Sequence, residues 1–242
     1  NNQIGTLGPV KATGIQLTNS QSLALAGLVS VGSGSIDVNT TSGGVTQATG
    51  GTIVAGTFTS GTSIASGLTL ASANNQIGTL GPVKATGIQL TDSQALTLAG
   101  LVSVGSGAID VTTTAGGVTQ ASGGTIVAGT FTSGTSIASG LTLASGTNQI
   151  GTLGPIKATG IKLTDSQALA LSGLVHVGSS GTIDIATTAG GVTQASGGTI
   201  VAGTFTTGTS IASGLTLAST ANQIGTLGPV KATGIQLTNS QS

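Results

Sequence analysis

The chain has 242 residues, a formal net charge of zero and 4% charged residues, and it contains no Arg, Glu, Cys, Met, Trp or Tyr. Five Lys balance five Asp, and three Phe are the only aromatic residues, so the basic patches and stacking surfaces used in nucleic-acid binding are missing. The absence of Cys excludes a disulfide framework and a thiolate metal site. No apolar run approaches the ~20 residues of a membrane-spanning helix, so we expect neither a nucleic-acid partner nor a transmembrane segment.

The residues that remain favour strands over helices. Gly, Thr, Ser and Ala dominate, while Val, Ile and Leu supply most of the apolar side chains. Such β-branched residues are enriched in strands, and the Gly residues do not follow the every-third-position pattern of collagen. The chain is also too apolar and too weakly charged for a typical disordered segment. We therefore predict an all-β fold.

One phrase recurs along the whole chain. NQIGTLGPVKATGIQLT occupies 2–18, returns unchanged at 75–91 and 222–238, and occurs at 148–164 with Ile156 for Val and Lys162 for Gln. The repeats are 3–75, 76–148, 149–222 and a partial repeat, 223–242. Repeats of this kind indicate a solenoid, a propeller or an array of small domains. We expect one continuous β-solenoid over 1–242.

The copy 87–159 shows the predicted elements in chain order. Short segments of alternating apolar and polar residues, separated by Gly, Ser or Asn, begin with Ile88–Leu90, Leu96–Leu98 and Ile109–Val111. Alternation sends the Ile, Leu and Val side chains to one side of each strand and the Gln, Thr and Asp side chains to the other. Each segment is therefore predicted to be a strand with one buried face.

Gly residues divide this copy into thirds, 87–107, 108–129 and 130–159, which predict about three coils per repeat. If each third is one coil of a parallel β-helix, two stacks follow. One stack contains Ile88, Ile109 and Phe131, and the other contains Leu96, Val118 and Leu141. We expect the longest third to contain an extra corner or loop at GTNQIGTLGP, because Gly and Pro turn the chain there.

Three phrases carry a resemblance to a known family. LTDSQALTLAG, GGVTQASGGTIVAGTFT and NQIGTLGPVKATGIQLT resemble the repeats of filamentous haemagglutinin-like proteins, which are β-strand-repeat adhesins of Gram-negative bacteria. The resemblance implies a right-handed parallel β-helix, export by type V or two-partner secretion, and a location outside the cell or at its surface. The function expected from it is that of a rigid, non-catalytic shaft in an adhesin.

Two other organisations stay open from the residues. Open coil edges favour end-to-end stacking with further copies of the repeat, in the same chain or in neighbouring chains, so the chain could be the protomer of a self-assembling filament. A string of Ig-like domains, one per repeat, is the third hypothesis, although one Phe per repeat is little for a sandwich core.

The sequence predicts no enzyme, no metal site and no cofactor. His176 is the only His and replaces the Ser30 and Ser103 of other copies, and a lone His makes neither a catalytic triad nor a three-ligand zinc site. We expect it to face solvent. Neither GxGxxG nor GxxxxGK occurs, so a phosphate-binding loop is absent. No catalytic, cofactor-binding or metal-binding residues are predicted.

The carboxylates are interpreted as structural. Asp92 and Asp165 stand where other copies have Asn19 and Asn239, and an Asn or Asp before Ser is typical of a turn that caps local N–H groups. The aspartates of the other repeat position are expected to lie about three coils apart, too distant for the paired acids of glycoside cleavage. These are Asp37, Asp110 and Asp184.

Three further patterns are given structural interpretations. The one Phe of each repeat is expected in the core rather than in a sugar-stacking platform. Asn39–Thr41 matches a glycosylation acceptor, but we expect no modification there because other copies lack the Asn. Thr rows are a feature of ice-binding solenoids. The threonines Thr113, Thr119, Thr125 and Thr132 do not recur at a constant coil spacing, so we expect Thr to serve as an outward-facing strand former.

Overall fold

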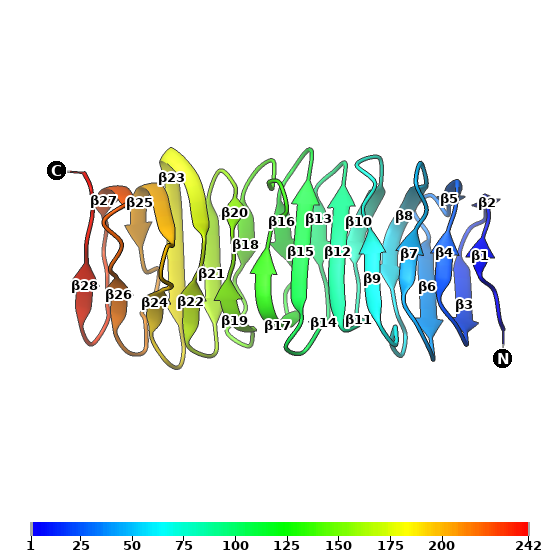
Figure 1. Ribbon diagram of the computed structural model, residues 1–242, viewed down its shortest axis with the longest axis horizontal. Helices are drawn as coiled ribbons and strands as arrows, with labels where there is room; N and C mark the ends of the chain where they lie inside the picture. The colour runs from blue at the N-terminus through cyan, green and yellow to red at the C-terminus, as the bar shows by residue number, and fades with distance from the viewer. Residues whose placement is uncertain (1, 242) are drawn as a thin grey trace.

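The computed structural model describes residues 2–241, which form a parallel β-solenoid of about 11 turns with roughly 22 residues per turn and no helix. The coils lie side by side along one long axis, and the two termini lie at opposite ends of the stack (Figure 1). The predicted all-β solenoid is therefore confirmed.

Two 14-stranded sheets run along the solenoid. The first sheet consists of β1 (Thr6–Leu7), β4 (Leu23–Leu25), β7 (Val45–Gln47), β9 (Gly67–Leu70), β11 (Val83–Lys84), β12 (Gly87–Asp92), β14 (Leu101–Ser103), β15 (Ala108–Thr113), β17 (Thr125–Thr132), β19 (Gln149–Leu153), β22 (Leu169–Leu171), β24 (Val192–Gln194), β26 (Leu215–Leu217) and β28 (Ile235–Leu237). The second sheet consists of β2 (Val10–Lys11), β3 (Ile15–Asn19), β5 (Leu28–Ser30), β6 (Ser35–Thr40), β8 (Thr52–Thr59), β10 (Gln76–Leu80), β13 (Leu96–Leu98), β16 (Val118–Gln120), β18 (Leu141–Leu143), β20 (Ile156–Lys157), β21 (Ile161–Asp165), β23 (Leu174–Thr187), β25 (Thr199–Thr206) and β27 (Gln223–Leu227).

Strand pairing follows the predicted stacks residue by residue. Ile88 pairs with Ile109, which pairs with Phe131, and the register of β13, β16 and β18 places Leu96, Val118 and Leu141 in line. All strand pairs among the described residues are parallel, so the antiparallel sandwich of an Ig-like domain is not what the repeats form. The hypothesis of tandem Ig-like domains is therefore wrong for the fold.

The core is a continuous column of aliphatic side chains enclosed between the sheets. In β12, Ile88 and Leu90 are buried while Gln89 is exposed, which is the alternation that the sequence predicts. Phe58, Phe131 and Phe205 are fully buried, so the interpretation of Phe as a core residue is confirmed. Stacking keeps the inward positions of neighbouring coils in contact, and no single coil could enclose such a core alone.

A repeat contains an odd number of half-turns. Within 3–75 the chain crosses the two sheets alternately in seven half-turns, formed by β1, β2 with β3, β4, β5 with β6, β7, β8 and β9. The next copy therefore begins in the second sheet with β10, and the third begins again in the first sheet with β19. The three coils expected per repeat are thus refined to three and a half, and equivalent residues of successive copies lie on opposite sheets.

The extra half-turn is the segment for which we predicted a corner or loop. NQIGTL is not a protruding loop, because Gln149–Leu153 forms β19, which pairs with β17 below and β22 above. In the sequence this segment has the pattern of a turn, because it is short and lies next to Gly and Pro residues. Burial of Ile150 and Leu153 shows instead that the segment contributes to the core.

Corners are made by Gly residues in the left-handed region. Gly116 has φ +74°, and a Cβ there would lie 2.7 Å from the backbone of Ala95 in the neighbouring coil. Only Gly combines this backbone conformation with such a close approach. The one-residue insertion of the third copy also falls at a corner, where β23 shows register shifts between His176 and Gly178 and between Gly178 and Thr182.

Truncation of a core Phe tests the stacked core. Phe131→Ala should lower the free energy of unfolding by about 3–5 kcal/mol, because the fully buried ring leaves a cavity that a rigid coil cannot close. Urea unfolding followed by circular dichroism measures the change. Leu101→Ala is the matched control, since Leu101 is 47% exposed and should change the unfolding midpoint little. Equal effects of the two substitutions would contradict the assignment of the core.

Candidate functional site

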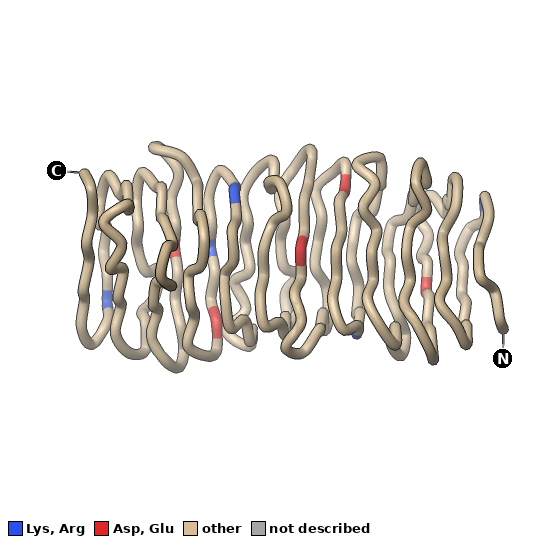
Figure 2. The backbone as a smooth tube through the Cα atoms, viewed as in Figure 1, with Lys and Arg blue, Asp and Glu red and all other residues tan. Residues whose placement is uncertain are grey.

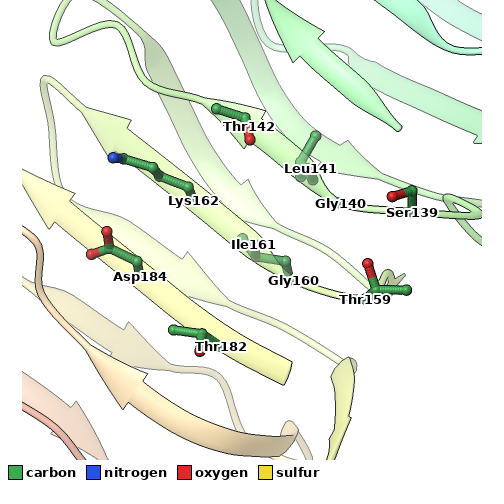
Figure 3. A pocket seen from close by; sticks show the side chains of 10 residues that line it. All are labelled: Ser139, Gly140, Leu141, Thr142, Thr159, Gly160, Ile161, Lys162, Thr182 and Asp184. Carbon is green, nitrogen blue, oxygen red and sulfur yellow. The ribbon is translucent and has the colours of Figure 1, made fainter. Parts of the chain in front are cut away.

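A surface groove recurs in two copies of the repeat. In the third copy it is lined by Ser139–Thr142, Thr159–Lys162, Thr182 and Asp184, on three neighbouring coils (Figure 3). In the second copy the equivalent groove includes Gln89 and Asp110 and lies on the opposite sheet. Gly140 and Gly160 leave the floor open because they carry no side chain.

The chemistry of this groove is sparse. Lys162 and Asp184 are in-register neighbours on β21 and β23, and their side chains project from adjacent strands. The Asp184 carboxylate accepts a hydrogen bond from the Gly208 N–H, and the equivalent Asp110 accepts one from Gly134. Partial burial raises the pKa of Asp110, and the Gly134 N–H opposes the shift. The third-copy groove thus holds one carboxylate and one ammonium group, whereas the second-copy groove holds one carboxylate and the Gln89 amide.

Ionisable groups are scattered elsewhere along the solenoid (Figure 2). Asp37, Asp110 and Asp184 lie on β6, β15 and β23, so successive members of this set are on opposite sheets. Within the part of the chain that the structure describes, no group of three or more His, Cys, Asp or Glu residues is arranged to hold a metal ion.

Asp92 and Asp165 are fully buried at the ends of β12 and β21. Oδ1 of Asp92 accepts a hydrogen bond from the Ile77 N–H, and Oδ1 of Asp165 accepts one from Ile150, both at 3.0 Å. The predicted capping role is thus seen: one donor lies in the preceding half-turn, and the local N–H groups of the two residues after each Asp also favour its carboxylate. Oδ2 of each carboxyl is buried without a hydrogen-bond partner among the described residues.

The Asn residues at the same repeat position show what the unpartnered oxygen lacks. Oδ1 of Asn19 accepts from the Ile4 N–H, and its Nδ2 donates to the carbonyl oxygens of Ile4 and Gln21 at 2.9 Å. A carboxylate can only accept, so a proton on Oδ2 is needed to supply the missing donor. Burial raises the pKa of Asp92 and of Asp165 to about 6, against the opposing backbone N–H groups. Burial therefore favours the protonated form of both residues up to about pH 6.

A buried amide pair, which the sequence patterns did not reveal, lies beside each of these sites. Asn75 is fully buried, and its Oδ1 accepts hydrogen bonds from Gln47 Nε2 at 2.7 Å and from the Ile53 N–H at 3.0 Å. Its Nδ2 donates to Gln47 Oε1 and to the Thr91 carbonyl. The same pairs recur as Gln120–Asn148 and Gln194–Asn222. The Asn75 side chain thereby connects the segments that contain Gln47, Ile53 and Thr91.

His176 lies beside Lys157 rather than standing alone in solvent. The two residues are in-register neighbours on β23 and β20, and both line a second groove at the corner that carries the insertion. His176 is half-buried, and its Nδ1 is buried without a partner among residues 2–241. His176 points outward between the buried Val175 and Val177, so the expected solvent-facing position is seen in part, with the side chain half-buried.

Asn39 is unsuited to glycosylation in this fold. Its exposed fraction is 6%, its Nδ2 donates to Asp37 Oδ1, and its Oδ1 accepts from the N–H and the hydroxyl of Thr62. A modifying enzyme would need the nitrogen at the surface, so the expectation of no modification agrees with the geometry.

No family model, curated protein or solved structure matches the chain. None of the described residues forms a helix long and apolar enough to span a membrane. Function therefore has to be proposed from the architecture and from the residues that it displays.

Substitution of the buried acids gives a pH-dependent prediction. Asp92→Asn should stabilise the chain at pH 8 by about 1–3 kcal/mol, because the amide supplies the donor that the ionised carboxylate lacks. The folded pKa of about 6 lies above the ordinary value of 3.8, so the native chain loses stability as pH rises through this range. The stabilisation by Asp92→Asn should accordingly vanish below pH 3.8, where Asp92 is protonated in both the folded and the unfolded chain.

Urea unfolding at pH 8 and at pH 3.5 measures this difference. The reciprocal substitution Asn19→Asp is the control and should lower stability at pH 8 while having little effect at pH 3.5. A stabilisation by Asp92→Asn that is the same at both pH values would contradict the raised pKa of Asp92 in the folded chain.

Loss of the buried amide should destabilise the neighbouring coils. Asn75→Ala leaves the Gln47 amide and the Ile53 N–H without their partner, at a cost of about 1–3 kcal/mol for each buried group left unsatisfied. Thermal unfolding measures the effect. Asn74 is adjacent in sequence but exposed, so Asn74→Ala is the matched control and should leave the melting temperature nearly unchanged.

Proposed function

We propose that the chain is a non-catalytic structural section of a bacterial cell-surface or secreted adhesin, in which it forms a rigid elongated shaft. The observation that carries the proposal is the continuous parallel stack of coils from β1 to β28 (Figure 1). At ~4.8 Å per coil, 11 turns extend about 50 Å, so added repeats lengthen the molecule without a new core.

Two kinds of observation support this proposal. The repeat phrases resemble those of filamentous haemagglutinin-like adhesins, which favours a secreted or surface location and export by type V or two-partner secretion. The poverty in reactive groups favours display over catalysis, because the grooves recur with the repeat and hold few ionisable side chains. An enzyme normally gathers such groups at a single site.

A second candidate is the protomer of a filament that assembles by head-to-tail stacking of coils. Leu227 is 41% exposed and Ile235 is 49% exposed, whereas their repeat equivalents Leu80 and Ile88 are almost completely buried. One further coil would cover these side chains and pair with the open edges of β27 and β28. That coil could come from the same polypeptide or from another copy.

Limited proteolysis with small-angle X-ray scattering tests the shaft. The 242-residue chain should scatter as a rod about 50 Å long and should resist internal cleavage, because each inner coil is hydrogen-bonded on both edges. The matched comparison is the same chain in denaturant, which should be cut throughout. A set of stable fragments of one repeat each, or scattering from a string of beads, would contradict the proposal.

The mass of the native polypeptide distinguishes the shaft from the filament. An antibody to the repeat detects the protein on intact cells that express it, and complete denaturation followed by mass spectrometry gives the mass of one chain. Fibres that dissolve into chains near 22.7 kDa support the filament. A much larger polypeptide supports the shaft, and labelling only after cell lysis would contradict both surface roles.

A further inference from the structure

Threonines that are irregularly spaced in the sequence form a regular column on the second sheet. Thr57 pairs with Thr79, Thr79 with Thr97, Thr97 with Thr119, and Thr119 with Thr142. Five consecutive coils thus carry Thr at one register position, with neighbours ~4.8 Å apart. We name these five residues the threonine column. Of the four threonines considered in the sequence analysis only Thr119 belongs to this column, so those four indeed do not recur at one coil position. The column is formed by other threonines, and the number of residues between its paired positions varies from coil to coil.

The hydroxyl groups of the threonine column have unused hydrogen-bonding capacity. No hydrogen bond of their Oγ1 atoms to another described residue is present, and none of these atoms is buried. Other threonines differ, since Thr40 donates to the Gly43 carbonyl and Thr59 donates to the Pro82 carbonyl. The column therefore offers its hydroxyls, together with the adjacent methyl groups, to whatever lies outside the sheet.

The surroundings of the column are small side chains, with one charged residue near its first member. Residues two positions further along the chain are Thr59, Gly81, Ala99, Ala121 and Ala144, and Thr59 pairs with Asp37 of the preceding coil. A Cβ at Gly81 would lie 3.1 Å from the Thr57 methyl carbon, so the Gly lies closely against the column. The column stops where Lys162 and then Asp184 take the same register position after Thr142 (Figure 3).

The odd number of half-turns creates a second column on the opposite sheet. Thr130 pairs with Thr152, which pairs with Ala170, followed by Thr193 and Thr216. This row has one methyl side chain in place of a Thr and is otherwise equivalent. Both broad faces of the solenoid therefore carry a hydroxyl row.

We propose that the threonine column and its counterpart bind the surface of ice. Alternating hydroxyl and methyl groups at a fixed spacing can hold a layer of ordered water, because the hydroxyls anchor some water molecules and the methyl groups restrict the orientation of others. Backbone pairing on both strand edges keeps the spacing rigid, so little order has to be created on binding. Without aromatic side chains the face lacks the stacking surface that favours sugars, which makes ordered water the better match. This activity does not depend on the proposed shaft function, since a single soluble chain should show it.

Inhibition of ice recrystallisation by the purified 242-residue chain tests the inference. The double variant Thr119→Lys with Thr193→Lys places a long charged side chain at the fourth of the five positions in each row and should abolish inhibition at concentrations where the unsubstituted chain is active. The matched control is Thr114→Lys with Thr188→Lys, which makes the same charge change at exposed turn positions and should leave inhibition unchanged.

Circular dichroism shows whether each variant is folded. If the first Lys pair unfolds the chain, Gln at Thr119 and Thr193 replaces it, because Gln89 already occupies this kind of register position without disturbing the coil. The Gln pair should also lose inhibition. No inhibition by the unsubstituted chain, or equal inhibition by the folded row variants and the control, would overturn the proposal. If the ice-binding test fails but the 242-residue chain still scatters X-rays as a rod, only the ice-binding proposal is overturned and the shaft function remains supported.

Discussion

Parallel pairing between successive coils is the constraint on which the rest of the structure depends. Each inner strand must meet a partner below and a partner above, so inward positions, outward positions and corners have to coincide from coil to coil. A coil that met this requirement for one neighbour but not for the next would end the stack. This explains why near-identical repeats are sufficient to build the molecule. A repeat whose coils pair with those of an identical repeat can be added again with the same contacts. It also explains the Gly residues at the corners, where a Cβ would meet the adjacent backbone.

Apolar stacking alone does not define where one coil sits along the next, since many Ile, Leu and Val positions are interchangeable. The buried Asn–Gln pairs supply this specificity, because an amide has donors and acceptors that must all be matched at once. The buried aspartates Asp92 and Asp165 extend the same principle. At two of the four equivalent sites an acid replaces the amide, and the fold accepts it by favouring the protonated form. A polar seam therefore accompanies the aliphatic core, and its chemistry makes stability depend on pH.

The strands and their stacking could be predicted because alternation at Ile88–Leu90 and Ile109–Val111 is a local pattern that directly reports one buried face. The half-turn at Gln149–Leu153 could not, because two Gly-flanked apolar residues read as a corner until their partners are known. Long-range pairs were equally hidden: Gln47 and Asn75 are separated by 28 residues, which is longer than one coil. The threonine column was missed for a related reason. Its members are 18 to 23 residues apart, so their alignment emerges only from the varying lengths of the corners.

The odd half-turn count has a consequence for how such a protein changes over generations. Tandem copies this similar invite unequal recombination, which adds or deletes whole repeats. Loss or gain of one copy would keep every stacking contact intact, yet it would rotate everything beyond the junction by half a turn about the long axis, because equivalent strands change sheets with each copy. Loss or gain of two copies would restore the original azimuth. Copy number would thereby set not only the reach of the molecule but also, by its parity, the direction in which a distal surface faces.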